Sequence, residues 1–163
     1  MYKVLWFISV IVVSVFLHAV QIEQEAALRA LLQAKNTVNR AVHAAAQQVD
    51  QAALAEGKRV INPVRAKEEM LQYIQYHLNL DELLEPLPNS LYQSKAIVDV
   101  FDVIQEDQSF PYIYTDEEKG IDITLQKPGV ILILRLEYPR AFSWIEPFGW
   151  DLKAAAEIVY DDT

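Results

Sequence analysis

The sequence predicts an α+β protein in which an N-terminal transmembrane helix continues into a long helix packed on an antiparallel sheet of about four strands. Three observations lead to this fold class. No glycine or proline occurs before Gly57. Because these residues cost about 1 and about 3 kcal/mol inside a helix, their absence allows one long rod. The rod begins with a membrane-length apolar run, and beyond residue 95 apolar and polar residues alternate as in strands.

The apolar run extends from Val4 to Val20. At 1.5 Å per residue it covers about 25 Å, slightly less than a hydrocarbon core about 30 Å thick. Trp6 suits the aromatic belt at one membrane surface. Lys3 precedes the run, and Glu23 is the next charged residue after it. The positive-inside rule then predicts a single-pass protein with a cytoplasmic N-terminus and an extracytoplasmic C-terminal domain.

Two alternatives to a retained anchor follow from the same residues. Leu17-His18-Ala19 places a small residue before a possible signal-peptidase cut at Val20, which would release the rest of the chain. A buried helix of a soluble protein would need an equally apolar partner helix, and the sequence offers none. We therefore expect residues 1–20 to be an uncleaved signal anchor, with cleavage after Ala19 as the main alternative.

The juxtamembrane helix is expected over residues 21–57 and carries a single apolar stripe. The stripe follows helical spacing and is expected to pack on the sheet or on neighbouring subunits. Packing on the protein's own domain is the commoner case, and the alternative is that residues 21–35 pack on other copies. Gly57 suits the C′ position of the helix. The members of the stripe are Leu31, Val38, Val42, Ala45, Val49 and Ala52.

Residues 58–163 are expected to form one extracytoplasmic α+β domain on that helix. Asn62 and Pro63 read as the N-cap and the first position of a second helix, with a stripe at Val64, Leu71, Ile74 and Leu78. Strands are expected at 95–104, 110–114, 121–125, 130–138 and 150–160. The strand at 130–138 is apolar on both faces and is therefore expected to be central. Pro128 and Gly129 are expected at the centre of a turn.

Four aromatic residues gather just before and at the start of the last strand: Phe142, Trp144, Phe148 and Trp150. Such a group can plug a core or form an exposed contact. Trp150 shares its strand face with Leu152, so we expect it in the core. Trp144 lies in the loop and is the candidate residue for a partner contact.

Composition excludes several classes of function. The net charge of −9, from 14 basic and 23 acidic residues, opposes nucleic-acid binding. The chain has no cysteine, which excludes disulfides, thiolate chemistry and cysteine-ligated zinc. Neither a Gly-x-Ser-x-Gly elbow nor a glycine-rich phosphate loop occurs.

The remaining polar residues favour surface roles. His43 lacks a second ligand three or four residues away. His77 shares its helical face with Glu69 and Tyr73, and we expect this to be a solvated face rather than an acid–base pair. A deep pocket that joined either histidine to carboxylates would instead indicate an enzyme. We predict no catalytic residue, cofactor, metal or small-molecule substrate. Two acidic stretches lack EF-hand spacing and are expected to be surface charge rather than calcium sites. They are Asp99, Asp102, Glu106 and Asp107, and Asp116, Glu117 and Glu118.

The hydrophobic span, the continuous helix and the C-terminal sheet together resemble pilin-like proteins. The alanine-rich stretch NTVNRAVHAAAQQVDQAALAEG is similar to the post-membrane segment of TadE/TadG-like proteins of tight-adherence (Tad) pilus systems. The stretch FPYIYTDEEKGIDITLQKPGVILILRLEYPR is similar to the sheet region of Gram-positive relatives. The resemblance implies a membrane-anchored, non-enzymatic minor pilin or accessory subunit of a Tad-type pilus or type II secretion-like apparatus. Its partners would be the membrane and other pilin-like or secretion-machine subunits, including copies of itself.

One feature of prepilins is missing from this sequence. Prepilins carry a glycine before the span and a glutamate five residues after the cut, whereas Met1-Tyr2-Lys3 precede the span here. We therefore do not expect processing by a prepilin peptidase. Alternative functions are a single-span scaffold or envelope regulator that pairs through its juxtamembrane helix, and a secreted binding domain if the chain is cleaved after Ala19. The candidate membrane and assembly contacts are Trp6, Ser14, Ala19, Leu31, Val38, Val42, Ala45, Val49 and Trp144.

Overall fold

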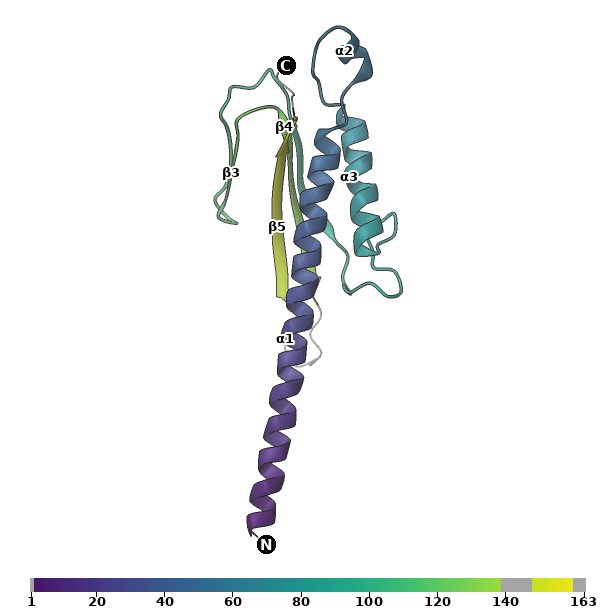
Figure 1. Cartoon of the computed structure of the whole chain (residues 1–163). Coiled ribbons are helices and arrows are strands. Elements are labelled where there is room, and N and C mark those ends of the chain that lie inside the picture. The colour runs from purple at the N-terminus through teal and green to yellow at the C-terminus, as the bar shows by residue number, and fades with distance from the viewer. Residues whose placement is uncertain (1, 139–147, 160–163) are drawn as a thin grey trace.

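The computed structural model describes residues 2–138 and 148–159 and has the expected α+β composition (Figure 1). Helices and strands follow one another as the sequence pattern predicts, with the helices first. The helices are α1 (Tyr2–Ala46), α2 (Gln51–Ala55) and α3 (Pro63–Leu78). The strands are β1 (Ile97–Ile104), β2 (Tyr112–Asp116), β3 (Ile121–Leu125), β4 (Gly129–Tyr138) and β5 (Phe148–Glu157).

Helix α1 is one unbroken helix of 45 residues. Its N-terminal half projects alone from the rest of the molecule, and its C-terminal half lies between the sheet and α3 (Figure 1). The predicted continuity between the apolar run and the following helix is therefore confirmed. The helix ends at Ala46, however, so the prediction that it reaches Gly57 is wrong.

A chain reversal replaces the last part of the predicted rod. The backbone N–H of Asp50 donates to the carbonyl oxygen of Val60 at 2.8 Å, and the N–H of Asn62 donates to that of Gln48 at 2.7 Å. These bonds hold residues 48–50 against 60–62. The absence of glycine and proline permits a helix here but does not require one, because such long-range bonds satisfy the same backbone groups.

Asp50 also starts the short helix α2. Its side chain accepts hydrogen bonds from the backbone N–H groups of Ala52 and Ala53, as an N-cap residue does. Gly57 follows the C-cap residue Glu56 with a φ of +80°, a conformation that favours glycine. The C′ assignment of Gly57 is thus correct, but for α2 rather than for the long helix.

Helix α3 begins as the sequence predicts and runs back along α1 (Figure 1). The side chain of Asn62 accepts from the N–H groups of Val64 and Arg65 at 3.1 Å, and Pro63 occupies the first turn. Val64 is exposed, so it does not belong to the buried stripe that was predicted for this helix. The buried face is formed by Ala66, Met70, Ile74 and Leu78.

The main sheet has three antiparallel strands in the order β1-β4-β5. Strand β4 is central, as predicted, and its first six residues are all buried. Alternate residues of β4 and β5 face α1 and α3 and form the main core with them. On the sheet these core residues are Val130, Leu132, Leu134 and Leu136 of β4, with Leu152, Ala154 and Ala156 of β5 and Ile158 beyond it.

Strands β2 and β3 form a separate hairpin in place of the predicted single sheet of about four strands. The hairpin lies over the face of the main sheet that points away from α1 (Figure 1). Its apolar side packs on Ile104 and Ile131 through Leu125, Tyr112 and Ile123. Alternation along a strand predicts a buried face. It does not distinguish a strand that extends a sheet from a pair that covers it.

Candidate functional site

The N-terminal half of α1 is the most conspicuous surface of the molecule. By length and composition this helix can cross a membrane, and its most apolar 18-residue window has 0% of its residues buried. Trp6, with 71% of its surface exposed, Ser14 and Ala19 all lie on this part. Two of its polar side chains bond within the helix, since Ser9 Oγ donates to the carbonyl oxygen of Leu5 at 2.9 Å and His18 Nδ1 lies 2.8 Å from that of Ser14. This pattern suits an apolar medium, where backbone groups need internal partners.

The C-terminal half of α1 places three of the six predicted stripe residues inside the protein, whereas the last one, Ala52, is exposed on α2. Val38, Val42 and Ala45 are fully buried in the core. Leu31 is half-buried against that core, and Val49 follows the helix end, where it bridges Ile61. These residues therefore join α1 to its own domain in this structure. Trp144, the ninth predicted contact residue, lies outside the described residues.

Of the other aromatic candidates, Trp150 lies at the end of the main sheet. Trp150 is partly buried and packs against the main core, on the strand face that it was expected to share with Leu152. Its ring stacks on that of Tyr138 with a centroid distance of 5.7 Å. The two rings lie at the end where β4 finishes and β5 begins. At this end Tyr138 also lines a cleft with Ile22 and Ala26 of α1.

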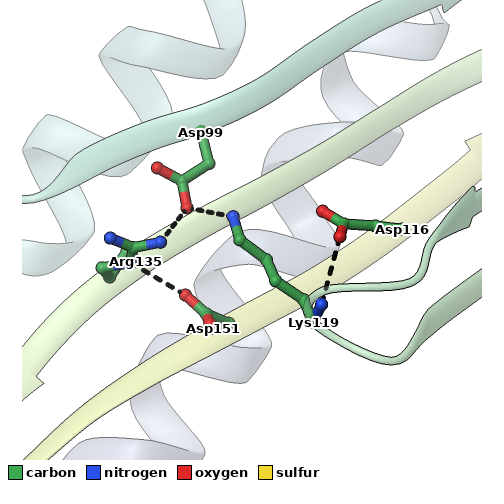
Figure 2. Close-up of polar contacts among 5 residues, drawn as sticks. All are labelled: Asp99, Asp116, Lys119, Arg135 and Asp151. Atoms are coloured by element: carbon green, nitrogen blue, oxygen red, sulfur yellow. Dashed lines mark hydrogen bonds and ion pairs between the residues drawn. The ribbon is translucent and has the colours of Figure 1, made fainter.

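A cluster of four charged side chains links the hairpin to the main sheet (Figure 2). Asp99 of β1 accepts from Lys119 Nζ at 2.5 Å and from Arg135 Nη2 of β4 at 2.9 Å. The Nε of Arg135 donates to Asp151 of β5 at 3.1 Å. Lys119 belongs to the β2–β3 turn, which Asp116 stabilises by accepting its backbone N–H. Every strand of the main sheet contributes one residue to this ionic cluster.

The ionic cluster cross-links the β2–β3 turn to the main sheet. The hydrogen bond to Asp99 raises the pKa of Lys119, and partial burial opposes this rise. The hydrogen bond to Asp151, followed by the charge of Asp99, raises the pKa of Arg135. Both cations therefore stay protonated at neutral pH and above it. The ion pair between Lys119 and Asp99 therefore persists over this pH range and holds the β2–β3 turn on the main sheet.

Sequence reasoning did not find this cluster. Asp99 was predicted to be surface charge together with its acidic neighbours, but its side chain is only 16% exposed and is paired twice. Asp99 lies at a register shift between Val98 and Val100, where the strand departs from regular pairing. Its partners are 20 and 36 residues away. No local spacing can indicate contacts over such separations.

The histidines occupy separate surfaces. His77 stacks on Tyr73 with a centroid distance of 4.2 Å and meets Tyr76 edge-on at 5.1 Å. These rings line an open cavity of about 720 Å³ that also includes Glu69. His43 is exposed on α1, outside that cavity. Within residues 2–138 and 148–159, no group of three or more histidine, aspartate or glutamate side chains could hold a metal ion.

An apolar groove lies between α3 and β1. Two cavities of about 540 Å³ and 570 Å³ share Lys67, Leu71 and Phe101 and so form one continuous depression. Strand β1 is an edge strand of the described sheet and forms one wall. Its lining combines apolar residues such as Leu71 and Phe101 with the charged residue Lys67. A surface of this kind can receive a neighbouring protein segment.

Comparison of the chain with models of known families, with curated proteins and with solved structures finds no match in any of the three. The resemblance to TadE/TadG-like proteins therefore stays a prediction. The function has to be argued from the geometry of this chain, chiefly from the division of α1 into an exposed apolar half and an embedded half.

Proposed function

We propose that the chain is a single-pass bacterial membrane protein that serves as a non-enzymatic minor pilin or accessory subunit of a Tad-type pilus or type II secretion-like apparatus. The observation that supports this most strongly is the continuity of α1. One half of this helix is apolar and exposed, and the other half belongs to the core of the domain. Such a helix can be held in a membrane or among other apolar helices without any change in the domain.

The pilin-like character of the fold is part of the same proposal. A protruding apolar helix whose second half packs on an antiparallel sheet is the arrangement on which the resemblance to pilin-like proteins rests. Here α1 packs on β4 and β5, while α3 covers its other side. In this proposal the N-terminus with Lys3 stays in the cytoplasm, and the domain lies outside the cell.

Contacts with other subunits would begin in the bilayer. Apolar helices associate there through close packing rather than through exclusion from water, so small residues mark the closest approach. Ser14 and Ala19 are the small exposed residues that suit this role. Beyond the membrane, the groove between α3 and β1 offers a neighbour an apolar surface.

The structure also gives one observation in favour of the scaffold alternative. Leu28 and Leu32 lie one helical turn apart on α1 beyond the apolar run, and more than half of each side chain is exposed. A second α1 could pair along these leucines. Such pairing would make the chain a scaffold or envelope regulator that associates through its juxtamembrane helix.

The first test is the intact mass of the protein in separated membrane and medium fractions. We expect the full-length mass in the membrane fraction. Protease added to the outside of intact cells should digest the domain, because the domain is proposed to lie outside the membrane. A product that begins at Val20 and accumulates in the medium would overturn the anchored model. It would leave a secreted binding domain as the function to pursue.

The second test separates the assembly subunit from the scaffold. The chain has no cysteine, so single cysteines can be introduced at chosen depths and oxidised in membranes. We expect Ser14→Cys to form disulfide cross-links with cysteine-bearing neighbours, and Val12→Cys, about 200° away around the helix, to form few. Efficient cross-linking of Leu28→Cys between copies, without cross-linking of Ser14→Cys, would favour the scaffold instead.

A further inference from the structure

The membrane-proximal end of the domain has a small apolar cleft against α1. The cleft has a volume of about 260 Å³ and combines three parts of the chain. Leu91 comes from the segment between α3 and β1, and Tyr138 ends β4. The remaining wall is the stretch of α1 that follows the apolar run, with Ile22, Glu25, Ala26 and Arg29. We call these six residues the collar.

The length of α1 gives the height of the collar above the membrane. A hydrocarbon core about 30 Å thick takes up about 20 helical residues, so a helix that enters it at Val4 leaves it near Glu23. The headgroup layer adds about 5 to 7 Å on each side, or about four more residues. The headgroup layer therefore spans about residues 24–27 of the helix, so residues 22–29 lie in it or directly beside it. A tilted helix would bring them deeper. Leu91 and Tyr138 line the same cleft as this stretch and therefore lie at the same height.

The side chains of the collar suit a lipid headgroup region. Ile22 and Leu91 are 68% and 49% exposed, which is unfavourable for large apolar side chains in water. Tyr138, with its ring stacked on Trp150, is of the aromatic type that is enriched at membrane interfaces. The two charged members of the collar are paired, because Arg29 donates to Glu25 of the preceding turn. The collar thus presents apolar and aromatic groups without an isolated charge.

We propose that the collar binds the lipid headgroup region, so that the domain is seated on the bilayer instead of standing away from it. This inference rests on the proposed anchor. Once seated, the domain would be restrained by two contacts, the span and the collar. Its orientation relative to the membrane would then be set before any partner subunit binds.

The test measures depth with single-cysteine variants of the full-length protein in phosphatidylcholine vesicles. Leu91→Cys reports on the collar and Val12→Cys on the span. Leu54→Cys is the matched control, because Leu54 is also a half-exposed leucine but lies on α2 at the opposite end (Figure 1). The end of α1 nearest α2 is about 35 Å beyond Glu23. Each cysteine carries a fluorophore, and the lipids carry nitroxide quenchers either on the headgroup or in the acyl chain.

We expect headgroup nitroxides to quench the label at Leu91, acyl-chain nitroxides to quench the label at Val12, and neither to quench the label at Leu54. Quenching at Val12 without quenching at Leu91 would overturn the seating but leave the anchor intact. Absence of quenching at Val12 would overturn both. Equal quenching at Leu91 and Leu54 would indicate general adsorption and also contradict the inference. Disulfide formation between copies at Leu91→Cys, without quenching, would assign the collar to a second copy.

Discussion

Tyr92 connects the segment between α3 and β1 to α1. Its side chain is almost completely buried, and its hydroxyl donates to the carbonyl oxygen of Ala30 at 2.8 Å. Burial raises the pKa of Tyr92 far above its usual value. The phenol therefore stays neutral and keeps its hydrogen bond. The two residues are separated by 62 positions, so no local pattern in the sequence singles out Tyr92.

We predict that Tyr92→Phe lowers the free energy of unfolding by about 1 kcal/mol, the usual net value of one hydrogen bond. The wild-type protein should also lose stability as the pH rises above about 10, because the unfolded tyrosine then loses its proton while the folded one retains it. The variant should lose less stability over this range. Urea unfolding in detergent below and above that pH measures both effects. Tyr76→Phe, at an exposed tyrosine, is the control, and an identical pH dependence in the three proteins would contradict the prediction.

Gly129 is a residue whose role differs from the sequence prediction. It is the first residue of β4 and pairs with Glu157, instead of lying at the centre of a turn. A Cβ atom added at Gly129 would lie 2.3 Å from the carbonyl oxygen of Ala156. The close approach of the β5 backbone, not a left-handed φ angle, therefore requires glycine here.

The substitution Gly129→Ala should destabilise the protein by about 1 to 3 kcal/mol, because β4 and β5 must separate to make room for the methyl group. Gly149→Ala in the same pair of strands is the matched control. Its added Cβ would lie 3.7 Å from the carbonyl oxygen of Leu136, an ordinary contact. Thermal and urea unfolding of both variants measure the difference. Equal losses of stability would show that the close approach at Gly129 is not the cause.

Among the elements, α1 depends on alanine for its embedded half. Four alanines on its buried face have no exposed surface, and small side chains let a helix approach a sheet and a second helix closely. They are Ala30, Ala34, Ala41 and Ala45. The alanine-rich composition predicts close packing in this region. It does not specify the partner, which the tertiary structure identifies as the protein's own sheet and α3.

The hairpin of β2 and β3 is held on the main sheet by an apolar layer and by the ionic cluster at its turn. The apolar contacts involve Tyr112, Ile123 and Leu125, whereas Lys119 provides the polar link. Because Asp99 and Lys119 are only 16% and 20% exposed, water screens their interaction less than it screens an open surface pair. The hairpin should therefore respond to the loss of this single lysine.

We predict that Lys119→Met speeds hydrogen exchange of amides in residues 112–125, while the central strand β4 keeps its protection. Loss of the ion pair leaves Asp99 with only Arg135 as a partner and frees the turn. Lys153→Met is the control, since Lys153 is an exposed lysine on β5. A double-mutant cycle with Asp99→Asn should show that the two substitutions are not additive. Additive losses of stability in the double-mutant cycle, or unchanged hydrogen exchange in residues 112–125, would contradict the prediction that the ion pair holds the hairpin on the sheet.

At the scale of the whole molecule, the chain consists of a folded domain and a protruding apolar helix that share α1. The protruding part contributes no buried residue in its most apolar 18-residue window. It therefore adds nothing to the core, and its composition needs another explanation. The cost of exposing so many large apolar side chains to water supports a membrane or an assembly of similar helices as its surroundings.

Removal of residues 2–20 should leave the domain folded, with a free energy of unfolding within about 0.5 kcal/mol of the full chain in the same detergent. Removal of residues 2–34 should unfold it, because this deletion also takes away Ala30, Ala34 and the acceptor of the Tyr92 hydrogen bond. Circular dichroism and urea unfolding of both shortened chains measure these outcomes. A large loss of stability from the shorter deletion would mean that the span contributes to the fold.

Much of the architecture was determined by the sequence itself, because its signals are local. The apolar run, the N-cap at Asn62 and the apolar character of β4 depend on residues close together in the chain, and all three predictions are confirmed. The same holds for the alternation in β5, whose buried face includes Leu152 and Ala154 as predicted.

Only the tertiary structure decided the features that join distant segments. The helix ends at Ala46 because residues 48–50 bond to 60–62, and the hairpin covers the sheet because its apolar side meets Ile131. The partners of Asp99 and Tyr92 likewise come from remote positions. The local preference for a helix or a strand is worth no more than about 1 kcal/mol per residue. A hydrogen bond or apolar contact between distant segments is worth at least as much, so these contacts determine the outcome.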